Sequence, residues 1–390
     1  YKIEEILPIE VYFFRLSMKK VINNGEAKMI NIPITENGDI DTKGFSESIK
    51  KVLGENKNHT TWLNQYENIK KIPLTFYFGQ HFFRLTYFQL ISTILKDQAV
   101  LYRETKAATL EQQGDYIFSY AALVVLYTLG WKHIKCKKKY GIPNAMSKVV
   151  NEEKRLIINQ SNKDNTSYMG FSHDQFYIIE SSEEEKRKSM QEIVRFKEYC
   201  DQFITIDNDC DLCLKDEKNI NIKDILGIVD YDSVSIAKKT GRILVSAEVI
   251  VSAICHMQEI NVFAVGIADF LAKESDNCDE LLIYVRKMVE YRFMIPFTIN
   301  TISCILDFYQ KACEKEKKSI VERWIDILEL STKDEKYKDV MVDHIQHCIG
   351  QLNNKNFLFT PIGKSLLVYW SDYSGRKISF TTTEDGKFNV

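Results

Sequence analysis

The 390-residue sequence contains few of the residues that interrupt regular structure, with only six prolines and sixteen glycines. Long coil linkers are therefore not expected. Neither sign of charge dominates, because 52 basic and 54 acidic side chains leave a formal net charge of −2. This balance excludes a polycationic chain, so any contact with nucleic acid has to come from a local patch of lysine and arginine.

Cysteine is also sparse, with nine residues scattered along the chain. Their odd number and wide spacing exclude a disulfide scaffold and favour a reducing compartment. The longest apolar run, 120–131, is shorter than the roughly 20 residues that a membrane-spanning helix needs. The first residues show no charged and apolar leader of the secretory type. We therefore expect a cytoplasmic protein without membrane contact.

Several signature motifs of common enzyme classes are missing. The sequence has no GxxxxGK[ST] phosphate loop, no GxGxxG after a strand, no GxSxG elbow and no HExxH. Each of these motifs places backbone amides, a nucleophile or metal ligands where its chemistry requires them. The sequence thus gives no support to P-loop nucleotide hydrolysis, Rossmann dehydrogenase chemistry, α/β-hydrolase chemistry or zinc peptidase chemistry of the HExxH type.

What the sequence does contain is ordinary globular composition, with 45% hydrophobic and 27% charged residues. Changes in the hydrophobic pattern divide the chain into four parts. Residues 1–60 form an N-terminal segment that fits the end of a preceding module, and residues 61–112 form a helical lead-in. Residues 113–270 carry mixed strand and helix patterns, and residues 271–390 are mainly helical.

Strand and helix patterns alternate within 113–270. This alternation predicts an α/β fold with a parallel sheet and helices on both of its faces. A polar loop is expected at 159–170. The expected strands are 116–118, 242–246 and 262–265, and the expected helices are 121–129, 144–150, 183–203, 232–239 and 247–257.

Two acidic residues stand out because of their places in this pattern. Asp232 begins an expected helix, and Glu248 follows the carboxyl end of an expected strand. In open parallel sheets ligands collect at that edge, and the preceding helix returns its N-terminus there. Two close carboxylates stay ionised when a cation lies between them, and hard oxygen ligands suit Mg²⁺ or Mn²⁺. The alternative interpretation is purely structural, with one acid capping a helix and the other in a first turn.

The same stretch resembles the second half of a PIN domain, a Mg²⁺-dependent ribonuclease fold. Residues 115–130 resemble the first strand and helix of that family, and residues 142–153 resemble its second strand and helix. The lead-in segment 71–74, Lys-Ile-Pro-Leu, is similar to one found before PIN-like modules embedded in large bacterial proteins. The resemblance covers roughly 60–270, and it implies that Glu152 or Glu153 supplies another metal ligand.

One position departs from the family pattern. The first PIN strand normally ends in an aspartate, and here that position is Ser119. Asp115 is four residues earlier, which is about 13 Å along a strand and too far to share a metal. Glu152 or Glu153 with Asp232 and Glu248 would then have to hold the metal.

Two functional hypotheses follow from this resemblance. The first is a ribonuclease that cleaves RNA phosphodiesters with Mg²⁺ or Mn²⁺. The second is a catalytically degenerate PIN-like scaffold or sensor with a protein partner in a larger bacterial assembly. A stress-response or antiphage system would be such an assembly, by analogy at the level of fold alone.

A basic cluster follows the first PIN-like helix. It includes Lys135, Lys137, Lys138 and Lys139, and aromatic residues flank it. Lysines beside aromatic rings can bind the phosphates and bases of RNA, so these four are candidate RNA ligands. The alternative is a solvated basic loop.

A zinc site is the remaining candidate. Cys210 and Cys213 have CxxC spacing, and His344, His347 and Cys348 could add ligands. A four-ligand site needs the two clusters to meet, and adjacent His and Cys ligands give awkward geometry. Zinc is therefore not expected.

Overall fold

A computed structural model describes most of the chain from residue 86 onward. The expected N-terminal segment 1–60 lies outside the described residues, as does the lead-in except for 86–96. The chain divides into two compact units, one of 1–72, 148–198 and 215–220, the other of 73–147, 199–214 and 221–390. The described residues are 86–96, 114–132, 139–161, 167–172, 175–180, 182–208, 222–257, 260–351, 357, 359–375, 381–382 and 388–389.

The second unit contains a five-stranded, all-parallel sheet with the order β5-β2-β1-β6-β7. Short apolar strands buried on both faces are typical of parallel sheets. The expected α/β fold with a parallel sheet is therefore confirmed. The strands are β1 (Tyr116–Phe118), β2 (Tyr140–Pro143), β5 (Ile204–Ile206), β6 (Ile243–Val245) and β7 (Ala264–Val265).

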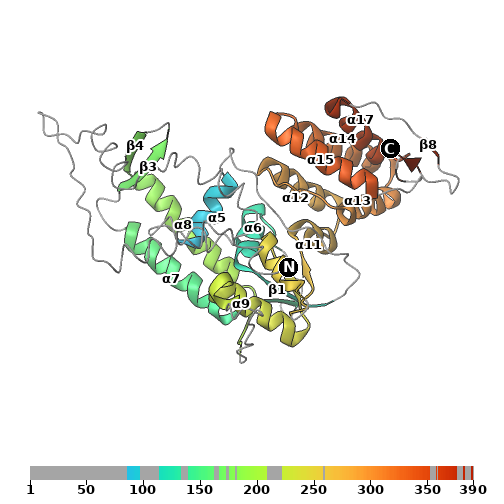
Figure 1. Ribbon diagram of the computed structural model, residues 1–390. Coiled ribbons are helices and arrows are strands. Elements are labelled where there is room, and N and C mark those ends of the chain that lie inside the picture. Colours follow the sequence, from blue (N-terminus) through green and yellow to red (C-terminus); the bar gives the residue numbers. More distant parts are fainter. Residues whose placement is uncertain are drawn as a thin grey trace, which may run out of the picture. The chain divides into compact units, whose positions relative to one another are not determined.

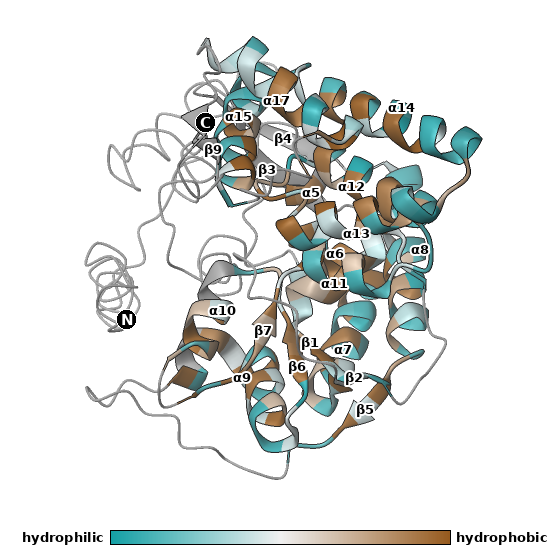
Figure 2. Cartoon of the chain, turned by 90° about the vertical axis from the view of Figure 1, so that its right-hand side faces the viewer, coloured by the Kyte–Doolittle hydropathy of each residue, from teal (hydrophilic) through white to brown (hydrophobic). Residues whose placement is uncertain are grey.

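The strands β6 and β7 consist of hydrophobic residues (Figure 2), and an aromatic cluster fills the core beside the central strand β1. The Phe118 ring lies 5.4 Å from the Phe270 ring and 6.1 Å from the Trp131 ring, centroid to centroid. Phe270 and Trp131 meet edge to face at 5.0 Å. Such pairs add about 0.5–1.5 kcal/mol each beyond their burial. The cluster joins residues that are 152 positions apart in the sequence.

In the described part of this unit, five helices up to residue 274 accompany the sheet. β1 leads directly into α6, which Ser119 caps by accepting a hydrogen bond from the Ala122 N–H at 3.2 Å. α9 packs along β1, β2 and β6, and α5 packs on α6. The bounds are α5 (Tyr87–Lys96), α6 (Tyr120–Leu129), α9 (Ile222–Thr240), α10 (Val249–Cys255) and α11 (Ile267–Glu274).

Residues 144–200 contain two helices and a hairpin, and the first unit holds all of them except the outer helix ends. These elements are α7 (Asn144–Ser161), β3 (Ser167–Ser172), β4 (Gln175–Glu180) and α8 (Glu183–Cys200). The polar loop expected at 159–170 was wrong at its two ends, because α7 continues to Ser161 and β3 begins at Ser167, while 162–166 lie outside the described residues. β3 and β4 pair antiparallel. The two aromatic residues of β3, Tyr168 and Phe171, are the strand signal that this expectation overlooked.

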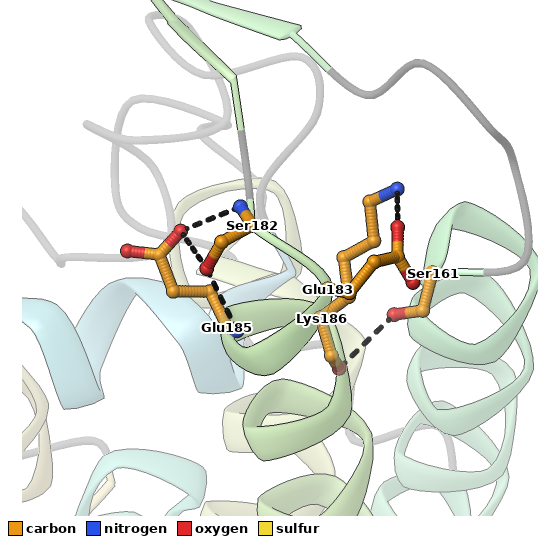
Figure 3. Close-up of polar contacts among 5 residues, drawn as sticks. All are labelled: Ser161, Ser182, Glu183, Glu185 and Lys186. Carbon is orange, nitrogen blue, oxygen red and sulfur yellow. Dashed lines mark hydrogen bonds and ion pairs between the residues drawn. The ribbon is translucent and has the colours of Figure 1, made fainter.

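A local capping box fixes the start of α8 (Figure 3). The Glu185 N–H donates to Ser182 Oγ at 3.2 Å, and the Ser182 N–H donates back to the Glu185 carboxylate at 2.9 Å. The Ser161 hydroxyl reaches the Lys186 carbonyl at 3.5 Å, which links the end of α7 to the first turn of α8. Reciprocal capping of this kind satisfies two backbone donors that a helix start leaves open.

Two further element predictions need correction. The helix expected at 183–203 ends at Cys200, and the short strand β5 follows it, which the sequence did not reveal. The helix expected to begin at Asp232 begins at Ile222 instead and is interrupted at Gly227, whose φ of 73° and ψ of 168° are not helical. Only glycine adopts this backbone region readily, so Gly227 sets where the second part of α9 starts.

The C-terminal part of the chain is helical, as expected (Figure 1). Neighbouring helices in this part pack against one another through Trp324, Ile345, Leu366 and other buried residues. In the portions that the structure describes, no helix combines the length and apolarity that crossing a membrane requires. The elements are α12 (Cys278–Glu290), α13 (Ile299–Lys311), α14 (Glu314–Ser331), α15 (Glu335–Gln351) and α17 (Pro361–Ser374), with β8 (Thr381–Thr382) and β9 (Phe388–Asn389) as a terminal antiparallel pair.

Candidate acidic site at the carboxyl edge of the sheet

The carboxyl ends of β1 and β6 lie side by side. Phe118 pairs with Val245, and the Ser119 N–H donates to the Val245 carbonyl at 3.0 Å. Glu248 follows three residues later, as the N-cap residue of α10. Its position just beyond a buried strand confirms the sequence-based placement. This edge is where parallel α/β sheets bind ligands.

Asp230 of α9 reaches the same edge from the helix that packs on these strands. Its Oδ1 accepts a hydrogen bond at 3.0 Å from the Tyr120 N–H, in the first turn of α6. One turn later the Ser233 hydroxyl donates to the Phe118 carbonyl at 3.0 Å, which holds α9 against the end of β1. Asp230 is only 1% exposed, and its Oδ2 is buried without a hydrogen-bond partner.

The surroundings of Asp230 disfavour a negative charge. Burial raises its pKa to about 6, and the hydrogen bond from Tyr120 opposes that rise only in part. The carboxylate also acts on Cys255 of α10, whose pKa is raised by burial and then by the charge of Asp230. A cation at the unpartnered oxygen would stabilise the ionised form, because an opposite charge within a few ångströms lowers a carboxyl pKa.

Glu248 is the second buried acid at this edge, with 3% exposure. The Tyr87 hydroxyl, at the start of α5, donates to Glu248 Oε1 at 2.5 Å. The Tyr87 ring lies against the Tyr120 ring with 4.7 Å between centroids. Tyr120 therefore contacts both halves of the site, through its backbone N–H to Asp230 and through its ring to Tyr87.

Asp232, the acid expected from the sequence, has a different environment. It lies inside α9 and is less buried than its neighbours, and the Asn208 amide donates to its Oδ1 at 2.8 Å. Adjacent helical positions turn by about 100°, so residues 230 and 232 face directions about 200° apart. Asp230 is a buried acid at the sheet edge that the sequence analysis did not name. The spacing of Asp230, Ser233 and Ala237 on one buried stripe is the signal that could have identified it.

The other predicted acids have contacts of their own. Glu152 forms an exposed ion pair with Arg155 at 2.9 Å, and Glu153 is buried. Both belong to the first compact unit, so their part in the metal site stays a prediction. Asp115 pairs with Arg242 at 3.0 Å, at the amino end of β1, which agrees with its expected distance from the site.

The basic cluster is described only at Lys139. Its Nζ lies 2.6 Å from the buried Glu274 carboxylate and 5.2 Å from the centre of the Tyr116 ring. Lys139 therefore lies at the amino edge of the sheet, opposite to the acids. Lys135, Lys137 and Lys138 fall outside the described residues.

The proposed zinc ligands of the C-terminal region have structural contacts. His344 Nε2 lies 2.7 Å from the Phe297 carbonyl and 3.7 Å from Cys348 Sγ, and burial lowers the pKa of His344 to about 4. Cys210 and Cys213 belong to the residues that are not described.

The donor set of the acid pair suits a particular kind of metal binding. Within the described ranges, no three or more His, Cys, Asp or Glu side chains form a group that could hold a metal ion. Zinc needs three or four such ligands. Mg²⁺ keeps several waters and commonly uses only one or two carboxylates together with substrate phosphates. Asp230, with its unpartnered oxygen, and Glu248 fit this second mode.

Comparison with known families gives one result for this region. The family model described as "PIN domain associated with the TPR-GreAB-C-PIN system" matches residues 119–254. The match includes Asp230 and Glu248 and begins at Ser119. No curated protein and no solved structure gives a significant match to the chain.

Proposed function

We propose that the PIN-type domain, of which the family model matches residues 119–254, cleaves RNA phosphodiesters with a Mg²⁺ or Mn²⁺ ion held by Asp230 and Glu248. One observation carries this proposal: the buried Asp230 presents an oxygen without any hydrogen-bond partner at the ligand-binding edge of the sheet. Buried polar atoms are rarely left unpaired, and a metal ligand is one of the functional reasons for an exception. The resemblance to PIN domains supplies the reaction class.

Each residue of the proposed site has a separate role. The Tyr120 N–H fixes one oxygen of Asp230, so that the other stays directed away from the helix start. Burial keeps water from competing for that oxygen and strengthens its attraction for a cation. A bound divalent ion would polarise the scissile phosphodiester and the attacking water. Glu152 and Glu153 remain proposed additional acids, and Lys135, Lys137 and Lys138 remain proposed RNA contacts.

A second candidate function is a non-catalytic interaction module in a larger assembly. The observation that favours it is Ser119, whose hydroxyl caps α6 at the position where PIN domains normally carry an aspartate. The family description names a TPR-GreAB-C-PIN system, which supports a role among protein partners. Cytoplasmic location and a part in bacterial defence belong to this proposal as well.

An RNA-cleavage assay with Mg²⁺ or Mn²⁺ separates the two functions. We expect the wild type to cleave and Asp230→Asn combined with Glu248→Gln to lose at least 100-fold in rate, because removal of metal ligands removes the charge that the reaction needs. Asp115→Asn is the control, because Asp115 pairs with Arg242 at the amino end of β1, opposite to the proposed site.

Asp232→Asn is the third arm of that assay. If Asp232→Asn lowers the cleavage rate as much as the double variant does, the sequence-based assignment of Asp232 as a metal ligand is restored. A wild type without cleavage, but with activity gained in Ser119→Asp, would establish the degenerate module. No cleavage by either protein would overturn the ribonuclease proposal.

A further inference from the structure

We infer that Tyr87, which lies outside the matched residues 119–254, is a positioning residue of the acid pair. This inference rests on the proposed function. It assigns to α5 the task of orienting Glu248, so that the PIN-type site is incomplete without a segment that precedes the matched domain.

The contact between Tyr87 and Glu248 is a strong one. The hydroxyl-to-carboxylate distance of 2.5 Å is in the range of charge-assisted O–H···O⁻ bonds, which are about twice as strong as neutral ones. The two residues are 161 positions apart in the sequence, so no local turn brings them together. The bond fixes the direction in which the Glu248 carboxylate points.

The start of α5 is itself held in place. The Gln89 N–H donates to Thr86 Oγ1 at 3.2 Å, and the Thr86 N–H donates to Gln89 Oε1 at 3.0 Å, which makes a capping box around Tyr87. Behind it, Phe88 and Ile91 are buried, at 4% and 0% exposure. Tyr87 is the first residue of this helix, so its backbone has little conformational freedom. A residue that positions another side chain needs such a fixed backbone.

Tyr87 and Tyr120 together connect the two acids. The Tyr87 hydroxyl binds one oxygen of Glu248, and the Tyr120 N–H binds one oxygen of Asp230. The two rings pack against each other at 4.7 Å and so keep the two donors in a fixed relation. Hydrogen-bond partners of ligating carboxylates commonly affect metal affinity by 10- to 100-fold.

The test is the affinity for Mn²⁺ alone, measured by titration calorimetry without RNA. We expect Tyr87→Phe, which keeps the ring and removes only the hydroxyl, to weaken Mn²⁺ binding 10- to 100-fold. Tyr337→Phe is the matched control, because it removes another buried tyrosine donor, the one that binds the Phe293 carbonyl at 2.8 Å. Its Mn²⁺ affinity should equal that of the wild type, and thermal unfolding of both variants checks that they fold.

Three results would overturn the inference. Unchanged affinity in Tyr87→Phe, with affinity lost in Asp230→Asn/Glu248→Gln, refutes the role of Tyr87 and leaves the proposed function standing. Tighter binding in Tyr87→Phe shows that Tyr87 competes with the metal and does not position its ligand. Unchanged affinity in Asp230→Asn/Glu248→Gln refutes the metal site and the inference together.

Discussion

Asp230 and Asp269 are two buried aspartates with different partners. Asp230 Oδ1 accepts one backbone hydrogen bond, whereas Asp269 Oδ1 accepts hydrogen bonds from the Thr298 hydroxyl at 2.5 Å and the Asn300 amide at 2.9 Å. Both aspartates have a buried Oδ2 without a hydrogen-bond partner. The Asp269 contacts join α11 to the start of α13, so we assign Asp269 a structural role. The proposed metal site uses Asp230 because its carboxylate lies where β1 ends and α6 begins, whereas the contacts of Asp269 connect α11 to α13.

Asp269 should make the stability of the protein depend on pH. Burial raises its pKa to about 6, so the folded state holds this proton more tightly than the unfolded state does. The stabilisation is full below pH about 4 and is lost as pH rises through about 6, roughly 3 kcal/mol in all. Asp269→Asn should remove this part of the dependence. Urea unfolding at pH 4 and pH 7 gives the free energy of unfolding at each pH. An equal change in this free energy between the two pH values in the wild type and in Asp269→Asn would contradict the expectation.

The sequence identified some residues of the site and not others. Glu248 and Ser119 could be placed because each follows a short apolar strand, whose end is easy to read. The sequence analysis named Asp232 and not Asp230 because it began the helix at residue 232, whereas α9 begins at Ile222 and its buried stripe includes position 230. The direction of a side chain on a helix changes by about 100° per residue, so a residue two positions away lies on a different face of the helix.

At the scale of elements, α9 depends on Gly227. A Cβ at this position would meet nothing within 4 Å, so a lack of space does not explain why the residue is glycine. The reason is its φ of 73°, which other residues rarely adopt. We expect Gly227→Ala to destabilise the protein by about 1–3 kcal/mol. Because the second part of α9 carries Asp230, the variant should also weaken Mn²⁺ binding.

Gly350 provides the control for that substitution. It lies in α15, where an added Cβ also meets nothing within 4 Å and the backbone is helical. Gly350→Ala should stabilise the protein by about 0.5–1 kcal/mol. Chemical denaturation of both variants measures the two effects, and a stabilising Gly227→Ala would show that the strained backbone can relax.

Most elements with strong periodicity were predictable, and the exceptions share a cause. β1, α6 and β6 were recognised from apolar runs bounded by Ser or Gly. β5 is as short as β1 and β6, but it lies at the edge of the sheet and is not fully buried, so it takes its identity from pairing with β2, a contact that no local pattern records. Tertiary pairing, and not propensity, decides such short strands.

At the scale of the whole molecule, the matched residues do not form a complete core. Residues 119–254 exclude β1, β7 and Phe270, although β1 is the central strand and Phe270 packs on Phe118 and Trp131. A fragment of 119–254 should therefore lack a cooperative thermal transition, whereas a fragment of 86–375 should retain one. Near-ultraviolet circular dichroism during heating measures this. A cooperative transition in the short fragment would contradict the assignment of the core.

The anomalous diffraction of Mn²⁺ in crystals of the protein tests the central claim most directly. We expect a peak within about 2.5 Å of Asp230 Oδ2 and of a Glu248 carboxylate oxygen, and no such peak in Asp230→Asn/Glu248→Gln. A peak beside Asp232 and Asn208 instead, or an empty carboxyl edge at saturating Mn²⁺, would contradict the assignment of Asp230 and Glu248 as the metal ligands.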